Sequence, residues 1–380
     1  MSSSLLQQQY KWIDSDAELE RCAGLWSQKK LIALDTEFMR SKTYYPCAGL
    51  IQINDGDASY LIDPLKVNDY FPLVEIFDNA EIAVALHSCS EDLDVLNCEL
   101  ACIPANIFDT QVACALLGKG FSLSYANAVK SVLDVELPKS ETRSDWLARP
   151  LSEAQIYYAA LDVEYLLHLS LALQHELSET QRQHWMQEER EHTVRQFKTQ
   201  QDADQAYLRI KSAWKLDPKQ LAVLRALARW RENAAQERDL PRNHVLKENV
   251  LFGLALRCPE QERHLRVIDG IQERTIRRDG EHLLRLIADA LQSDPDSWPA
   301  PMPPPLTKEE QAQVKELRAV VQEIAEKNNV APEMLMKKKE YEQIVRLMPE
   351  YTSASELPVH GWREDILADA LRKKLAELRG

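Results

Sequence analysis

The stretch Leu31-Ile32-Ala33-Leu34-Asp35-Thr36-Glu37 decides how this 380-residue chain is interpreted. Its four apolar residues predict a buried strand, and two carboxylates follow them two positions apart. Because strand side chains alternate between the two faces of a sheet, we expect Asp35 and Glu37 on the same face. Buried carboxylates are unfavourable unless they are paired or bind a cation. The pair therefore indicates a binding site, with a simple solvent-facing strand end as the alternative.

A second acidic segment, His87-Ser88-Cys89-Ser90-Glu91-Asp92-Leu93, follows the apolar run 82–86. We interpret Asp92 as a candidate site residue at the start of a helix. The helix dipole also favours an acid in the first turn without any function. By position alone, Glu91 and Asp94 compete with Asp92 for the role.

A phenol and a third acidic position lie in Tyr157-Tyr158-Ala159-Ala160-Leu161-Asp162. Tyr158 and Asp162 are four residues apart and so share one face of a helix. Tyr157 lies about 100° round the helix from Tyr158, which excludes it from that face. Because a phenol has a pKa near 10, we expect Tyr158 to orient a water molecule rather than to take its proton. An ordinary surface pair is the alternative.

Taken together, four acids from three segments predict a metal site. Carboxylate oxygens are the ligands that hard cations such as Mg²⁺ and Mn²⁺ prefer. Asp35, Glu37, Asp92 and Asp162 could hold two such ions, with Tyr158 beside them. Two divalent ions and an oriented water molecule are typical of a metal-dependent nuclease.

Composition limits the class of protein. Hydrophobic content of 45% and charged content of 28% suit a folded protein of two or three domains. No run of about 18 apolar residues predicts a membrane span, and the first ten residues lack the pattern of a signal peptide. Seven cysteines, without CxxC spacing, predict reduced thiols. We therefore expect a cytoplasmic protein without membrane contact, and no obligate protein partner is evident.

The charge is divided unevenly along the chain, whose formal net charge is −14. Residues 1–200 hold 16 Lys and Arg against 30 Asp and Glu, whereas residues 207–292 hold 17 against 12. The acidic part carries the candidate metal ligands. The basic part could bind phosphate, although most surface charges only face solvent.

Hydrophobic periodicity predicts an α/β domain with a mixed sheet, followed by helical segments. The expected strands are 31–37, 49–54, 59–63 and 82–87, and the expected helices are roughly 70–79, 90–99, 109–118, 122–133 and 152–175. Ser152 and Gln155 form a capping box that starts the last of these helices.

We predict three domains. Residues 1–200 form the α/β domain, with a core at about 30–175 and a helical bridge at 176–206. Residues 207–292 form a first helical domain. Six prolines mark residues 293–306 as an extended linker. Residues 307–380 form a second helical domain, which begins at a Thr307–Glu310 capping box.

The candidate site motifs resemble those of a known nuclease superfamily. Leu34-Asp35-Thr36-Glu37, Ser90-Glu91-Asp92-Leu93 and Tyr158-xxx-Asp162 are similar to the three exonuclease motifs of the DEDD superfamily, and the tyrosine marks its DEDDy branch. Four further stretches resemble the ribonuclease D family: Tyr44-Tyr45-Pro46, Leu50-Ile51-Gln52-Ile53, Phe108-Asp109-Thr110-Gln111 and residues 139–151. The helical segments resemble HRDC domains (helicase and RNase D C-terminal) through Trp230-Arg231, Arg238-Asp239-Leu240-Pro241-Arg242-Asn243 and Gly361-Trp362-Arg363.

This resemblance implies a ribonuclease H-like exonuclease domain with two small all-α HRDC-like domains. It also implies 3′→5′ hydrolysis of RNA to nucleoside 5′-monophosphates, most of all in 3′ maturation of precursor tRNA. Asp35 would bridge two divalent metal ions, and Glu37 and Asp162 would hold the ion that activates water. Asp92 would hold the other ion, directly or through water.

Five further residues are candidates for substrate binding. Gln52 and His87 could contact the terminal nucleotide, and Phe38 could stack on a base. Arg143 and Arg149 could hold phosphate. For each, packing in the core or at the end of a strand is the alternative.

Two other functions compete with this interpretation. One is a DNA 3′→5′ exonuclease of the same fold, since nothing in the site plainly recognises a 2′-hydroxyl. The other is a non-catalytic RNA-binding scaffold, which would usually have lost one of the acids. The helical domains could also mainly contact protein.

Overall fold

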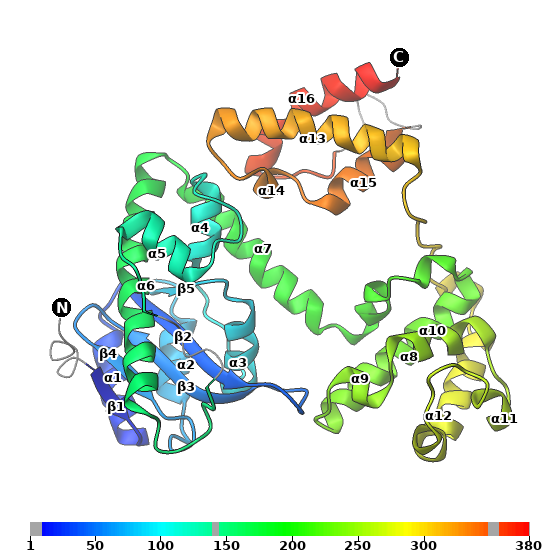
Figure 1. The fold of residues 1–380 in the computed structure, drawn as a ribbon, viewed down its shortest axis with the longest axis horizontal. Coiled ribbons are helices and arrows are strands. Elements are labelled where there is room, and N and C mark those ends of the chain that lie inside the picture. The colour runs from blue at the N-terminus through cyan, green and yellow to red at the C-terminus, as the bar shows by residue number, and fades with distance from the viewer. Residues whose placement is uncertain (1–9, 139–143, 349–356, 380) are drawn as a thin grey trace. The chain divides into compact units, whose positions relative to one another are not determined.

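The structure is a computed structural model that describes residues 10–138, 144–348 and 357–379 (Figure 1). The chain forms two compact units. Unit 1 takes the described residues of Met1–Met39, Cys47–Thr193 and Leu306–Gly380, and unit 2 takes Arg40–Pro46 and Val194–Pro305. The C-terminal helices thus belong to the same unit as the sheet, and the three successive domains that the sequence indicates stay a prediction.

Unit 1 contains a six-stranded sheet in the order β1-β4-β3-β2-β5-β6. The strands are β1 (Tyr10–Ile13), β2 (Leu31–Met39), β3 (Cys47–Asn54), β4 (Ser59–Ile62), β5 (Ala83–Leu86) and β6 (Ile107–Asp109). Strand β2 pairs antiparallel with β3 and parallel with β5. The predicted α/β class with a mixed sheet is therefore confirmed.

The helices between and after these strands cover the sheet or follow it in the chain. They are α1 (Asp16–Trp26), α2 (Phe71–Asp78), α3 (Ser90–Leu100), α4 (Thr110–Leu116), α5 (Tyr125–Leu133) and α6 (Glu153–Glu179), followed by α7 (Gln183–Gln201), whose residues from Val194 onward belong to unit 2. Helix α6 contacts β2, β3, β4 and β5, and Figure 1 shows it along the sheet. Its predicted capping box is present, with the Ser152 and Gln155 side chains bonded to each other's backbone N–H.

Among the described helices, α6 alone is long and apolar enough to cross a membrane by length and composition. However, 56% of its most apolar window is buried inside the molecule. The core helix of a folded domain meets the same two criteria, because it is covered by other elements instead of lipid. The contacts of α6 with four strands identify it as such a helix.

Three elements were not predicted from the sequence. Strand β1 and helix α1 lie before residue 30, where the core was expected to begin. Strand β6 has three residues, which is too short to show a period of two. Its last residue, Asp109, caps α4 by accepting hydrogen bonds from the backbone N–H groups of Gln111 and Val112. The sequence predicted that this helix begins at residue 109, but Asp109 is its N-cap and the helix begins at Thr110.

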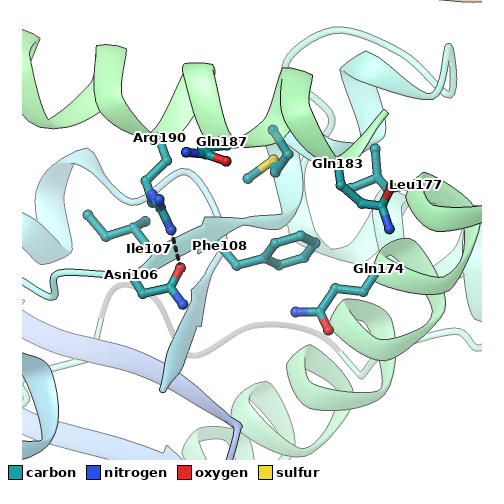
Figure 2. A pocket seen from close by; sticks show the side chains of 9 residues that line it. Asn106, Ile107, Phe108, Gln174, Leu177, Gln183, Gln187 and Arg190 are labelled. Carbon is teal, nitrogen blue, oxygen red and sulfur yellow. Dashed lines mark hydrogen bonds between the residues drawn. The ribbon is translucent and has the colours of Figure 1, made fainter. Parts of the chain in front are cut away.

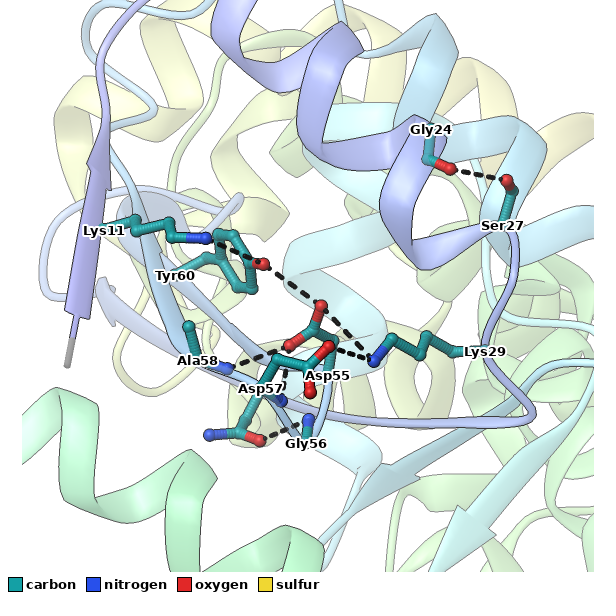
Figure 3. Close-up of polar contacts among 10 residues, drawn as sticks. Lys11, Gly24, Ser27, Lys29, Asp55, Gly56, Asp57, Ala58 and Tyr60 are labelled. Atoms are coloured by element: carbon teal, nitrogen blue, oxygen red, sulfur yellow. Dashed lines mark hydrogen bonds and ion pairs between the residues drawn. The ribbon is translucent and has the colours of Figure 1, made fainter.

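The turn between β3 and β4 is fixed by a buried carboxylate (Figure 3). Asp55 is 4% exposed and accepts hydrogen bonds from the backbone N–H groups of Asp57 and Ala58, both at 3.0 Å. The Tyr60 hydroxyl donates to the other Asp55 oxygen at 3.1 Å, and Lys29 binds Asp57 at 2.7 Å. These bonds hold the two strands in register beside the face that α6 covers.

The C-terminal helices of unit 1 are α13 (Lys308–Asn328), α14 (Pro332–Leu335), α15 (Lys338–Leu347) and α16 (Trp362–Arg379). They share one hydrophobic core with α4, α5 and the end of α6. The indole rings of Trp185 and Trp362 stack at 4.3 Å with an interplanar angle of 16°. The Trp362 indole N–H donates to Glu189 at 3.0 Å, and Arg363 forms a salt bridge with the same carboxylate at 2.7 Å. A stack of the half-buried Trp185 on the buried Trp362, and a salt bridge from the half-buried Arg363 to the buried Glu189, thus attach these helices to α7.

A second contact joins the turn after α13 to the end of α4. The Ala331 N–H donates to the Ala115 carbonyl at 2.9 Å, as in a backbone ladder. One Arg182 nitrogen donates to the carbonyls of Leu116, at 2.5 Å, and Asn329, at 2.8 Å. Because it satisfies carbonyls at both helix ends, Arg182 cross-links two segments that are far apart in sequence.

Unit 2 is helical apart from its loops, which confirms the predicted all-α class for its region. Its elements are η1 (Ala203–Arg209), η2 (Ala213–Lys215), α8 (Pro218–Glu237), α9 (Arg242–Val245), α10 (Glu248–Arg257), α11 (Glu262–Leu265), α12 (Glu273–Gln292) and η3 (Pro295–Ser297). The periodic residues Leu221, Leu224 and Leu227 are fully buried in its core.

The loop Arg40–Pro46 also belongs to unit 2 and carries one of the family-like motifs. The Tyr44 hydroxyl donates to Glu232 at 2.6 Å, and Arg242 donates to the same carboxylate at 2.5 and 2.7 Å. Burial raises the pKa of Glu232, but the hydrogen bonds from Arg242 and Tyr44 outweigh it and lower this pKa below its ordinary value. The Arg242 guanidinium is thus engaged with a buried acid.

Candidate active site

Three acids meet where β2 faces α6. Asp35 and Glu37 alternate onto the same face of β2, and Asp162 projects from α6. One carboxylate oxygen from each lies within 4.8 Å of the others. The structure thus brings together three of the four predicted acids, from segments that are about 125 residues apart in the chain.

The electrostatics of this group fit a bound cation. Burial raises the pKa of Asp35 to about 6, of Glu37 to about 9 and of Asp162 to about 8. The charges of Asp35 and Asp162 raise the pKa of Glu37 further. Three carboxyl groups, of which Asp162 is buried and Asp35 and Glu37 are half-buried, oppose each other's ionisation and are stabilised as carboxylates by a divalent ion. Their oxygen ligands suit Mg²⁺ or Mn²⁺.

The fourth predicted acid, Asp92, lies beside this group and is 8% exposed. The Thr36 hydroxyl donates to Asp92 at 2.6 Å. Among the described residues, the three-acid group does not include Asp92. Burial and the charge of Asp35 nevertheless raise the Asp92 pKa, so the two carboxyls are close. Its competitor Glu91 is exposed.

Thr36 is a site residue that the sequence interpretation missed. It stands between the two strand acids, and alternation sends its side chain to the face where α3 lies. The Asp35-Thr36-Glu37 order and the expected helix at Asp92 were the two features of the sequence that pointed to Thr36. No spacing rule, however, pairs a strand hydroxyl with an acid 56 residues away.

Tyr158 lies one helical turn before Asp162 and is half-buried. Burial, the charge of Asp162 and the hydrogen bond between the two side chains raise the Tyr158 pKa above its ordinary value near 10. The phenol therefore keeps its proton and can donate it in a hydrogen bond. Tyr157 is 39% exposed, as its angle on the helix predicted.

The ring of Tyr158 rests on Trp146, with ring centres 6.3 Å apart. Trp146 in turn lies against a bulge in β3, where Gly49 is the extra residue opposite Glu37 and Phe38. A Cβ atom on Gly49 would lie 2.6 Å from the Trp146 Cβ and 2.7 Å from its carbonyl oxygen. Only glycine allows this approach of two backbones.

Replacing that glycine tests whether Trp146 positions Tyr158. We expect Gly49→Ala to push the Trp146 backbone away and to lower kcat by about tenfold, because misplacement by about 1 Å can cost up to 100-fold. Steady-state hydrolysis of RNA by the folded variant measures this. Gly24→Ala is the control, since its Cβ meets nothing within 4 Å. Equal kcat in both variants would show that Tyr158 does not depend on Trp146.

Tyr125 is a second residue that the sequence did not single out. Its hydroxyl donates to the backbone carbonyl of Asp162. Burial raises the pKa of Tyr125 well above its ordinary value, so this donor stays protonated. The bond ties α5 to the segment of α6 that carries the acid.

Family models match three parts of the chain. Residues 10–178 match a 3′-5′ exonuclease model, residues 220–287 an HRDC domain model, and residues 310–371 a model described as "Ribonuclease D, C-terminal HRDC domain". Ribonuclease D of Pseudomonas paraeruginosa is 43% identical over 367 residues, covering 96% of this chain and 97% of that protein. The chain belongs to the ribonuclease D family. It is accordingly a 3′–5′ exoribonuclease.

Ribonuclease D of Escherichia coli is a more distant member, 34% identical, with 97% of this chain and 99% of that protein covered. Its crystal structure superposes on this chain with a TM-score of 0.84. That protein is described as an exoribonuclease involved in structured RNA processing. The family membership, the exonuclease domain and the HRDC domains inferred from the motifs are thus confirmed.

Two predicted substrate contacts in this ribonuclease D family member lie on the central strands. Gln52 stands opposite Asp35 in the β2–β3 ladder but is fully buried, and both its side-chain polar atoms lack a partner among the described residues. It has no exposed surface to offer a nucleotide. Phe38 is half-buried directly after the bulge. Its role in stacking stays a prediction.

His87 is occupied by the protein on both ring nitrogens. Its Nδ1 lies 2.8 Å from the Thr110 hydroxyl, and its Nε2 lies 2.9 Å from the Leu123 carbonyl. Burial lowers the pKa of His87, which favours the neutral ring. These bonds give His87 a structural role, holding the loop before α5.

Arg149 also serves the fold. Its five guanidinium N–H groups have five acceptors: two Asp63 oxygens and the carbonyls of Gly49, Trp146 and Ala148. This leaves no donor for the predicted phosphate contact. Arg149 stays in this arrangement because its partner Asp63 is only 3% exposed and would lose its counter-charge if Arg149 turned to a phosphate. Arg143, the other predicted phosphate ligand, lies outside the described residues.

Proposed function

We propose that this chain hydrolyses RNA from the 3′ end with two divalent metal ions, Mg²⁺ or Mn²⁺, held by Asp35, Glu37 and Asp162, with Asp92 beside them. The observation that carries this proposal is the approach of the first three carboxylates to within 4.8 Å. Bound there, such ions would stabilise charge on the phosphate and acidify a water molecule.

The chain's own residues would supply position and hydrogen bonds. The Tyr158 hydroxyl, protonated and bonded to Asp162, can orient an attacking water molecule in line with the departing 3′ oxygen. Trp146 holds the phenol ring from behind. The Thr36 hydroxyl fixes Asp92 and leaves its second oxygen for a ligand or a water molecule. The products would be nucleoside 5′-monophosphates.

We propose structured RNA with a short unpaired 3′ end as the substrate, above all precursor tRNA with a 3′ extension, in the cytoplasm. The description of the Escherichia coli relative as a structured-RNA enzyme supports this. The HRDC regions that follow the exonuclease domain support it too, since they could hold a folded RNA body.

The test is a comparison of substrates under defined metal conditions. A 3′-extended precursor tRNA, a linear RNA and a DNA of the same sequence, all 5′-labelled, are incubated with Mg²⁺, Mn²⁺ or EDTA. The proposal predicts stepwise 3′ shortening of RNA that stops in EDTA, with faster shortening of the tRNA tail. Equal rates on RNA and DNA would favour the DNA exonuclease, and equal rates on tRNA and linear RNA would refute the preference for structured RNA.

The raised pKa values predict how stability depends on pH without metal. The folded site binds protons more tightly than the unfolded chain, so this stabilisation is complete below pH about 4 and is lost as pH rises to about 9. We therefore expect the Tm in EDTA to fall between about pH 4 and pH 9, and Mg²⁺ to reduce that fall. Calorimetry measures both. Glu37→Gln should flatten the EDTA profile; an unchanged profile in this variant would contradict the assignment.

A further inference from the structure

A cavity of about 530 Å³ in unit 1 is lined by two parts of the chain that are far apart in sequence. Phe121 comes from the loop between α4 and α5. Arg318 comes from α13, and Lys337, Lys338 and Tyr341 come from the start of α15. The cavity exists because the C-terminal helices dock on the exonuclease part through Arg182 and Trp362, as described above.

The lining is positively charged in a protein that is acidic as a whole. It contains three cationic side chains and one acid, Glu333, whereas the chain carries a formal net charge of −14. The Lys338 side chain is 79% exposed, and its salt bridge with Glu342 is 3.7 Å long. Such an exposed and loose bridge is weak, so the ammonium can turn to a phosphate group.

An exposed aromatic ring stands beside these cations. Phe121 is 50% exposed. The backbone on either side of it is left-handed, with φ of +138° at Gly120 and +52° at Ser122. The Arg318 guanidinium lies 5.5 Å from the centre of the Tyr341 ring and offers a second flat surface. Aromatic and guanidinium planes beside cations are what unpaired nucleotides bind.

The loop that presents Phe121 is connected to the active site. The Leu123 carbonyl accepts hydrogen bonds from His87 and Gln111, both at 2.9 Å. Two residues later, Tyr125 donates to the carbonyl of Asp162. From Phe121 to Tyr125 the chain spans at most about 14 Å, and a stacked strand advances about 3.4 Å per nucleotide. A strand whose 3′ end lies at Asp162 would reach Phe121 within roughly four to six nucleotides.

A cavity of about 370 Å³ elsewhere in unit 1 lacks these features. Figure 2 shows its Arg190 turned to Asn106, with 2.5 Å between the guanidinium nitrogen and the amide oxygen. Its other polar lining groups are neutral amides. Charge therefore distinguishes the cavity at Phe121 from this one as a site for a polyanion.

We propose that the cavity at Phe121 binds unpaired nucleotides of the RNA substrate, upstream of the 3′ end at Asp162. Phe121 stacks on a base, and Lys338 and Arg318 hold phosphate groups. Lys337, whose ammonium lies 2.9 Å from His192 Nε2, adds positive charge beside them. This proposal rests on the exoribonuclease function above. If the cavity binds RNA in this way, the docked C-terminal helices contribute to the binding of long 3′ tails and not to the hydrolytic step.

The test compares a trinucleotide with an unstructured RNA of about 12 nucleotides, because the shorter one cannot reach from Asp162 to Phe121. We expect Phe121→Ala and Lys338→Ala to lower kcat/KM on the longer RNA by at least about fivefold. Both variants should hydrolyse the trinucleotide at the wild-type rate. In EDTA, Lys338→Ala should also reduce the slope of log Kd against log salt by about 0.7 for the longer RNA.

Matched controls separate this site from general effects. Phe71→Ala removes a ring that is 65% exposed but outside the cavity, and Lys339→Ala removes an exposed lysine next to Lys338. Both should behave as wild type. Equal losses in Lys338→Ala and Lys339→Ala, or no loss on the longer RNA, would overturn the proposal. The proposal would also be overturned if Lys338→Ala lost the binding of a polyglutamate peptide that wild type binds, while Lys338→Ala still bound RNA as wild type does. Failure of wild type to hydrolyse either RNA would instead refute the proposed function.

Discussion

Asp162→Asn is expected to lower kcat on RNA by about 100-fold or more, with little change in affinity for RNA. The substitution keeps the shape of the side chain but removes one of three carboxylates that lie within 4.8 Å of each other. Residues that act on a metal only through its ligands already cost 10- to 100-fold when changed, so a ligand itself should cost at least as much. Single-turnover hydrolysis in Mg²⁺ and binding in EDTA measure the two quantities.

The control for this variant is Glu164→Gln, which removes a carboxylate from the same helix, two residues away. Glu164 does not belong to the three-acid group. It should keep wild-type kcat, and both variants should keep the wild-type Tm in EDTA to within a few degrees. If Asp162→Asn retained more than about a tenth of wild-type kcat, the three acids would not form the catalytic centre.

Trp362→Ala should destabilise unit 1 by about 3–5 kcal/mol, the usual cost of removing a buried tryptophan side chain. Trp362 is 1% exposed, stacks on Trp185 and donates to Glu189. The variant would leave a cavity and one unpaired acceptor on a buried carboxylate. Chemical denaturation followed by tryptophan fluorescence measures the loss. Limited proteolysis should also cleave between residues 293 and 306 faster, because the C-terminal helices release from α7.

Trp362→Phe separates the two contributions. Phenylalanine keeps an aromatic ring on Trp185 but loses the indole N–H, so the expected loss is about 1.5–3 kcal/mol, the range for hydrogen bonds to charged groups. If neither variant changed the unfolding free energy or the rate of proteolysis, the C-terminal helices would not be held by this contact.

Local patterns predicted much of the exonuclease fold. Strand alternation placed Asp35 and Glu37 on one face, and helical spacing paired Tyr158 with Asp162 and excluded Tyr157. These arguments succeeded because they depend on periods of two and 3.6 residues, which a sequence displays directly. The same reasoning could not locate Thr36 or Tyr125, because their bonds to Asp92 and Asp162 join segments of different elements.

The candidate substrate residues illustrate the same limit. Arg149 appeared suited to phosphate because of its charge, yet all its guanidinium N–H groups donate to Asp63 and to backbone carbonyls. The proline-rich segment predicted a spacer before a separate C-terminal domain. Nothing in its composition shows that Trp362 and Arg182 dock that region onto α7 and α4. Docking depends on surfaces that form only after folding.

The most direct test of a metal-dependent centre in this protein is to locate the ion. Crystals of the protein soaked in Mn²⁺ would be measured for anomalous scattering. We predict ions coordinated by Asp35, Glu37 and Asp162, at about 2.0–2.3 Å from their oxygens. Anomalous peaks only elsewhere, or none at a concentration of Mn²⁺ that supports hydrolysis, would contradict a metal-dependent centre at these three acids.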